Sequence, residues 1–172
     1  MFDRSICGKN HSQTLTFGQL PENVQQLQTM GNLTSPFTTA ALAVAVLCHM
    51  EADPEETFRM LDYLKGPAPT SPFEKQFIKE RLQGKFYKSF SFFRGATPEN
   101  GYTPQKPYTI DVSVNPYSFP DANWATVYVK SGGADSPRGI KLRCKPSTGQ
   151  WFLNELQCLS DIRLPVEEDP WA

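Results

Sequence analysis

The spacing of apolar residues changes once along this chain, at Gly84, and this change constrains the fold more than any other feature. Before Gly84, apolar residues recur at the three- and four-residue spacing that places them on one face of a helix. After Gly84, they alternate with polar residues, as in strands that have one buried face. The pattern predicts an α+β fold, with N-terminal helices packed on one face of a C-terminal curved antiparallel meander sheet.

Three of the expected helices share one start signal, a capping residue followed by proline. Ser35, Asp53 and Ser71 each precede a proline, whose fixed φ suits the first helical position. The apolar stretch after Ser35 predicts a central helix that is covered on most sides. The helix after Ser71 is expected to bury Phe73, Phe77, Ile78 and Leu82. A shorter helix is expected between residues 20 and 31.

Five segments alternate in the manner of strands, namely residues 86–92, 108–114, 124–129, 140–145 and 151–156. Short turns join the last three, which predicts antiparallel neighbours. The 172 residues fit a single domain, 1–172. Its expected parts are a flexible arm (1–19), a helical half (20–83), a sheet half (85–158) and a C-terminal tail (159–172).

Charge and composition exclude several classes of protein. The net charge of −1 without any basic run argues against a nucleic-acid binder. The longest apolar stretch, residues 36–50, is shorter than the ~20 residues of a membrane-spanning helix. The four cysteines form no C-x-x-C pair, so we expect no metal site and reduced thiols. No cofactor motif and no secretory signal are visible, which favours a cytoplasmic protein.

Catalysis has weak candidates only, because the chain has neither a G-x-S-x-G nor an H-E-x-x-H motif. The best general bases are Asp111 and Glu155, with Tyr108 or Tyr128 as a partner. A carboxylate whose pKa is raised inside an apolar cone can abstract a proton. Both carboxylates, however, alternate with apolar neighbours as solvent-facing residues do.

A glycine-rich hairpin loop at residues 131–138 is a candidate anion site. Gly132 and Gly133 could expose backbone N–H groups, and Arg138 could grip a phosphate or carboxylate. An ordinary turn with an internal pair between Asp135 and Arg138 explains the same residues.

Two other segments invite a binding role. The loop at 95–107 carries Glu99, Asn100 and Tyr102 between prolines, and it is either a shaped binding loop or a rigid cover over a sheet edge. The tail ends near Trp171, which we expect to dock into a groove, on its own domain or on a neighbour.

Four stretches resemble an uncharacterised family of bacterial proteins: residues 93–100 (FRGATPEN), 130–138 (KSGGADSPR), 149–153 (GQWFL) and 169–172 (DPWA). Residues 63–67 (YLKGP) extend the resemblance, which implies a bacterial cytoplasmic origin and carries over no catalytic residue. The element order with Gly149 and Trp151 also looks like the cone-shaped NTF2-like superfamily. That superfamily, which includes isomerases, dehydratases and non-catalytic binding domains, usually has a strand between its helices, and none is expected here.

Three functions remain open from the sequence. The leading hypothesis is a non-enzymatic binding or assembly domain that self-associates through a sheet face. The alternatives are a small-molecule or acid–base site in a cone between helices and sheet, and anion recognition by the glycine-rich loop.

Overall fold

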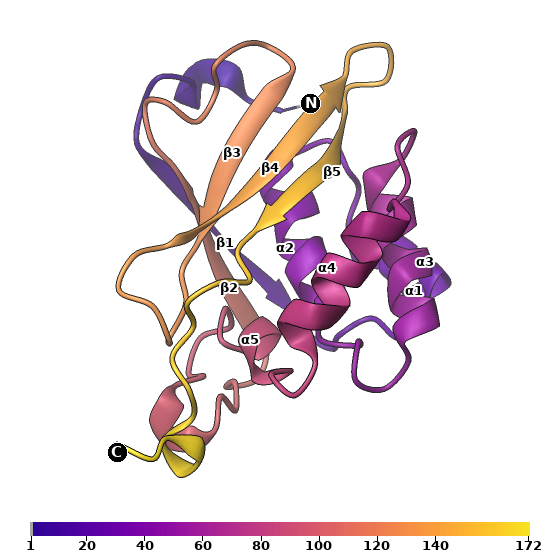
Figure 1. The fold of residues 1–172 in the computed structure, drawn as a ribbon. Helices are drawn as coiled ribbons and strands as arrows, with labels where there is room; N and C mark the ends of the chain where they lie inside the picture. Colours follow the sequence, from indigo (N-terminus) through magenta and orange to yellow (C-terminus); the bar gives the residue numbers. More distant parts are fainter. Residues whose placement is uncertain (1) are drawn as a thin grey trace.

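The computed structural model describes residues 2–172, and over this range an open five-stranded antiparallel sheet carries its helices on one face (Figure 1). The helices are α1 (Val24–Met30), α2 (Pro36–Leu47), α3 (Pro54–Lys65), α4 (Pro72–Leu82) and α5 (Tyr87–Phe90). The strands are β1 (His11–Phe17), β2 (Tyr108–Val114), β3 (Trp124–Val129), β4 (Arg138–Lys145) and β5 (Gln150–Gln157). The predicted α+β architecture is therefore confirmed.

The strands lie side by side in chain order, from β1 to β5. Strands β2 to β5 form the predicted meander, in which every neighbouring pair is antiparallel. All five helices lie in the connection between β1 and β2 (Figure 1). Strand β1 and strand β5 are thus the two edges of the sheet.

The prediction of a flexible arm over residues 1–19 is wrong, because residues 11–17 form β1. Strand β1 pairs with β2 along its whole length, from His11 opposite Val114 to Phe17 opposite Tyr108. Five of its seven residues are exposed, so the strand lacks the apolar alternation that identifies the others. The residues before it are also held, since the ring of Phe2 stacks on Phe119 at 5.6 Å between centroids.

The prediction of a strand at residues 86–92 is also wrong. This segment contains α5, and the sheet reaches its five strands through β1 instead. Phe86 and Phe90 are four residues apart, a spacing that fits one helical face as well as one face of a strand. The strands that follow the helices therefore begin at Tyr108, the first residue of β2.

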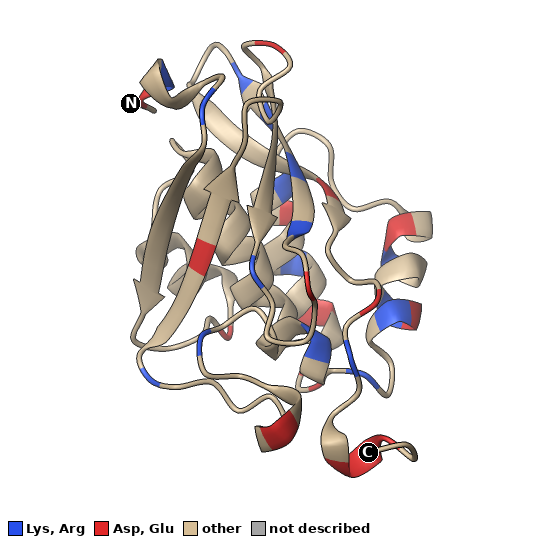
Figure 2. Cartoon of the chain, turned by 90° about the vertical axis from the view of Figure 1, so that its left-hand side faces the viewer, with Lys and Arg blue, Asp and Glu red and all other residues tan. Residues whose placement is uncertain are grey.

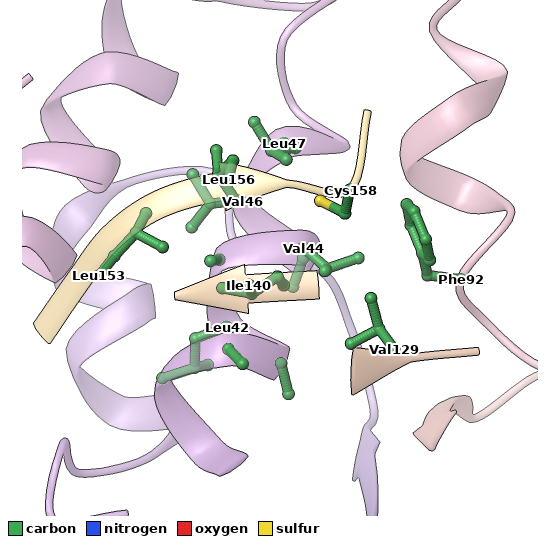
Figure 3. Packing of buried hydrophobic residues seen from close by; sticks show 14 of the residues in the cluster. Leu42, Val44, Val46, Leu47, Phe92, Val129, Ile140, Leu153, Leu156 and Cys158 are labelled. Carbon is green, nitrogen blue, oxygen red and sulfur yellow. The ribbon is translucent and has the colours of Figure 1, made fainter. Parts of the chain in front are cut away.

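The central helix, α2, fills the space beneath the sheet. Every residue of α2 except Thr38 is buried, which confirms the prediction of a helix covered on most sides. Figure 3 shows Leu42, Val44 and Val46 of this helix among Val129, Ile140 and Leu156 of the strands. These side chains occupy the space in which the alternative hypothesis of a small-molecule site would place a cone-shaped pocket.

Local signals set the ends of the three longer helices. The side chains of Ser35, Asp53 and Ser71 cap α2, α3 and α4, as predicted, and each accepts a backbone N–H of the first turn. At Ser71 the cap is reciprocal, since the Glu74 side chain also accepts the Ser71 N–H. This reciprocal cap fixes the start of α4 beside the edge strand β5.

Candidate functional site

A groove of about 140 Å³ runs between α3, α4 and the edge strand β5. Its walls are mainly apolar and include Leu61, Phe77, Ile78, Leu153 and Leu156. Four consecutive residues of β5, 153–156, line one side, so the groove follows the strand edge. An apolar cavity of about 150 Å³ can hold a benzene ring, and the groove is thus of a size for one apolar side chain.

Phe73 stands at the mouth of this groove. The sequence analysis placed it on the buried face of its helix, but its exposed fraction is 79%, and that prediction is wrong. The reciprocal cap between Ser71 and Glu74 fixes the rotation of the first turn, and this turn leaves Phe73 outside the core. Phe73 therefore adds an exposed aromatic ring beside the apolar walls of the groove.

A buried cation, Lys65, lines the groove. The ammonium group of Lys65 forms an ion pair with Glu74 and donates to the backbone oxygen of Asn154 at 3.2 Å. Burial by itself would raise the pKa of the Glu74 carboxyl. Hydrogen bonds from Lys65 and Ser71 outweigh this effect and hold that pKa below its ordinary value. Glu74 is therefore ionised at neutral pH, and the charge of Lys65 is matched.

Thr70 lines the groove and has a buried hydroxyl group. Its backbone N–H donates to Asp62 Oδ1 at 2.8 Å, which holds the residue in place. Its hydroxyl is buried and has no hydrogen-bond partner among the described residues. An unpaired buried hydroxyl costs free energy, and Thr70 therefore has an unused hydrogen-bonding group among the residues that line the groove. Nothing in the sequence pattern marks this residue, which follows a proline in the link between α3 and α4.

The predicted catalytic residues do not come together. Of the four, Glu155 lines the groove, whereas Asp111 lies on the exposed face of β2. Asp111 is bound by both Nε (2.8 Å) and an Nη (2.6 Å) of Arg94, and it accepts from the Thr14 hydroxyl at 2.8 Å. The Arg94 hydrogen bonds lower the pKa of Asp111, which is the opposite of what a general base in an apolar cone requires.

The two tyrosines are equally separate. The ring of Tyr108 packs edge-on against Phe93 at 5.7 Å between centroids. Tyr128 lies on β3, next to Ser113 of β2 across the strand pair. Neither tyrosine reaches the groove, so the geometry gives no support to the acid–base hypothesis.

The glycine-rich loop has already used the donors that an anion would need. The N–H of Gly132 donates to Ser91 O at 2.8 Å, and that of Gly133 to Ser131 Oγ at 3.1 Å. The loop packs inward on the segment after α5, and these two N–H groups therefore face protein. Their geometry gives no support to the anion hypothesis.

The expected ion pair within that loop is replaced by longer-range contacts. Arg138 donates to the carbonyl oxygens of Ser160 (3.2 Å) and Asp161 (3.0 Å), whereas Asp135 pairs with Arg163 at 2.9 Å. Both side chains thus tie the loop to the C-terminal segment.

The loop at 95–107 is a rigid cover. Asn100 accepts from the N–H groups of Thr97 and Thr103, both at 3.0 Å, and so fixes the turn. The buried hydroxyl of Tyr102 donates to Arg163 O at 2.6 Å, and burial raises the pKa of Tyr102 to about 12. Glu99 is exposed and forms no ion pair within residues 2–172.

Trp171 of the C-terminal tail is not docked on its own domain, which was one of the two positions expected for it. Trp171 is 94% exposed, and Leu164 and Val166 are 42% and 41% exposed. None of the large hydrophobic residues that are exposed in residues 2–172 lies in a strand. This distribution gives no support to self-association through aromatics on the sheet face.

Over residues 2–172, no helix is long and apolar enough to cross a membrane, and no cluster of His, Cys, Asp and Glu is arranged to hold a metal ion. No curated protein and no solved structure matches the chain, and the NTF2-like resemblance is not confirmed. Residues 19–166 match a family described as a domain of unknown function (DUF6935). This match confirms the resemblance to an uncharacterised family: the chain belongs to the DUF6935 family.

Proposed function

We propose that this domain is a non-enzymatic binding module, and that it binds a short apolar peptide segment of a partner protein in the groove between α4 and β5. The observation that carries the proposal is the apolar groove with the exposed ring of Phe73 at its mouth. Thr70, whose buried hydroxyl has no partner among the described residues, lines the same groove. A peptide supplies both parts of the complement. One apolar side chain fills the groove, and a backbone or side-chain polar group pairs with the hydroxyl.

The position of the groove favours a peptide over a compact small molecule. One wall is the outer edge of β5, and the other is formed by helices. Extended peptides bind in this way in domains where an exposed sheet edge runs beside a helix. Phe73 at the mouth adds an aromatic surface that becomes covered when a peptide lies across it.

A bacterial, cytoplasmic setting is part of the same proposal. All four cysteines are unpaired, and burial raises the pKa of the Cys144 and Cys158 thiols, the latter to about 12. Inert, protonated thiols of this kind are typical of structural cysteines in a reducing compartment.

The test is selection from a library of random ten-residue peptides displayed on phage, with the wild-type domain as bait. Dissociation constants of the enriched peptides are then measured by fluorescence anisotropy. Phe73→Ala is expected to weaken binding at least about fivefold, because it removes the aromatic surface at the mouth. Thr70→Val is expected to weaken it about three- to tenfold, the value of one neutral hydrogen bond.

Tyr117→Ala is the matched control, because Tyr117 is a similarly exposed aromatic (88%) that does not line the groove. Peptides that bind the Tyr117→Ala variant as tightly as the wild type, and the Phe73 and Thr70 variants more weakly, support the proposal. Enriched peptides that bind all four proteins equally contradict it, and so does a library from which nothing is enriched.

A further inference from the structure

A second cleft lies where the β4–β5 hairpin meets the link after α3. Unlike the groove beside α4, it has no acidic residue in its lining over residues 2–172. Its volume is about 280 Å³, and its apolar walls include Pro67, Pro146 and Phe152. All the charged residues that line it are cations: Lys65, Arg143 and Lys145. Lys65 is matched by Glu74, whereas Arg143 and Lys145 are exposed and form no ion pair in the described part of the chain.

The C-terminal tail has the complementary chemistry. Trp171 is 94% exposed, and three carboxylates, of Glu167, Glu168 and Asp169, immediately precede Pro170 and Trp171. Figure 2 shows acidic positions gathered beside the C-terminus. The Asp169 carboxylate accepts the backbone N–H of Trp171 at 2.8 Å, so the acidic and aromatic groups are presented together.

The tail is anchored at its base but projects away from its own domain. The backbone oxygen of Arg163 accepts from the buried Tyr102 hydroxyl at 2.6 Å, and the Arg163 side chain pairs with Asp135 at 2.9 Å. Figure 1 shows the C-terminus at the end of the molecule opposite the turn between β4 and β5. The tail therefore does not reach the cationic cleft of its own chain.

We infer that the cationic cleft binds the acidic, tryptophan-containing tail of a second copy of this chain. The indole of Trp171 packs on the apolar wall, and the tail carboxylates pair with the exposed guanidinium of Arg143 and ammonium of Lys145. Because the tail and the cleft lie at opposite ends, two antiparallel copies exchange both contacts in a closed dimer, whereas a head-to-tail arrangement gives a longer assembly.

The first measurement is sedimentation velocity of the wild-type protein over a range of concentrations, at low and at high salt. The average mass is expected to rise with concentration, and to rise less at high salt because the paired charges are exposed and screened. Trp171→Ala is expected to weaken association at least about tenfold, because a buried tryptophan carries much of the energy of an interface. Circular dichroism checks that the variant is folded.

Charge reversal identifies the two surfaces. One variant carries Arg143→Glu and Lys145→Glu, and the other carries Glu167→Lys and Glu168→Lys. In each variant alone the tail and the cleft have like charges, so neither is expected to associate with itself. In an equimolar mixture each tail meets an oppositely charged cleft, and association is expected to return.

Two controls separate this inference from the groove beside α4. Phe73→Ala is expected to leave self-association unchanged, and so is the double variant Lys9→Glu with Lys106→Glu, which reverses two exposed charges elsewhere. A wild-type protein that stays monomeric at every concentration overturns the inference. It is equally overturned if Trp171→Ala associates like the wild type, or if the mixture of reversed variants stays monomeric.

Discussion

Lys65 on α3 forms an ion pair with Glu74 on α4 although the Lys65 side chain is only 6% exposed. The same ammonium group donates to the backbone oxygen of Asn154 on β5 at 3.2 Å. One cation thus links two helices to the edge strand and occupies the backbone oxygen of Asn154, while the rest of the groove beside α4 stays open. It lines both the groove beside α4 and the cationic cleft, as do Leu153 and Asn154.

Replacement of Lys65 by Met is expected to lower the free energy of unfolding by about 1–3 kcal/mol. A fully buried pair costs about 3–5 kcal/mol when one partner is removed, but the Glu74 side chain is 37% exposed and water can solvate it. Urea unfolding followed by circular dichroism measures the change. Lys79→Met, at an exposed position of α4, is expected to stay within about 0.5 kcal/mol of the wild type.

Replacement of Thr70 by Val is expected to stabilise the free domain by roughly 1 kcal/mol. The substitution preserves the shape of the side chain and removes a buried hydroxyl that has no partner among residues 2–172. Thermal unfolding measures the effect, and an unchanged or lower melting temperature would argue that the hydroxyl is hydrated.

Thr39 provides the comparison for this experiment, because its buried hydroxyl donates to Trp151 O at 2.7 Å. Thr39→Val leaves that carbonyl oxygen of the edge strand without its donor, and we expect a loss of about 1–3 kcal/mol. If Thr70→Val stabilises the domain and Thr39→Val destabilises it, the change in stability is decided by hydrogen bonding and not by side-chain volume.

Gly66 is expected to tolerate no side chain, because the link after α3 packs directly on the ring of Phe152. Its φ is +62°, and a Cβ atom placed there would lie 2.5 Å from Cδ1 of Phe152. Gly66→Ala should cost several kcal/mol, the sum of backbone strain of about 1–3 kcal/mol and a steric overlap. Gly84→Ala is the control, with a φ of +70° and open space around the Cβ, and should show the strain alone in urea unfolding.

Asp111 is expected to stabilise the domain slightly at neutral pH through its pair with Arg94, and solvent screening keeps the effect small because the Arg94 side chain is 48% exposed. The hydrogen bonds from Arg94 lower the pKa of Asp111 in the folded state below 3.8. The stabilisation is therefore fully present when the pH lies above the ordinary pKa of an aspartate. It is lost as the pH falls through the lowered pKa of Asp111 in the folded state.

The measurement is the difference in unfolding free energy between wild type and Asp111→Asn, at about pH 7 and about pH 3. We expect the difference to shrink in acid, whereas Glu99→Gln, at an exposed position, should show no difference at either pH. A difference that grows in acid would show that the Asp111 carboxyl is stabilised in its protonated form.

The helices α2, α3 and α4 could be predicted closely because their start signals are local. A capping side chain and the proline after it act within one turn, so Ser35, Asp53 and Ser71 mark the same boundaries in any context. Strands β2 to β5 were also predictable, because each buries one face and therefore alternates. The α+β class follows from these two local patterns.

Strand β1 and helix α5 could not be predicted in this way. Strand β1 is mostly exposed and exists because its backbone pairs with β2, whose residues lie far away in the chain. The phenylalanines around α5 fit a helix or a strand, and the packing of that segment beneath the sheet decides between them.

The candidate sites depended even more on tertiary structure. Asp111, Gly132 and Arg138 have chemistry that a reactive or anion-binding site needs, but each has its polar groups bonded to a distant segment. The sequence by itself determined the fold class, the helix starts and the meander, because periodicity and capping act over a few residues. Only the tertiary structure decided which polar groups stay unpaired and which aromatics stay exposed, because both depend on partners far along the chain. Among the described residues, the hydroxyl of Thr70 is an example of an unpaired polar group, and the ring of Trp171 is an example of an exposed aromatic group.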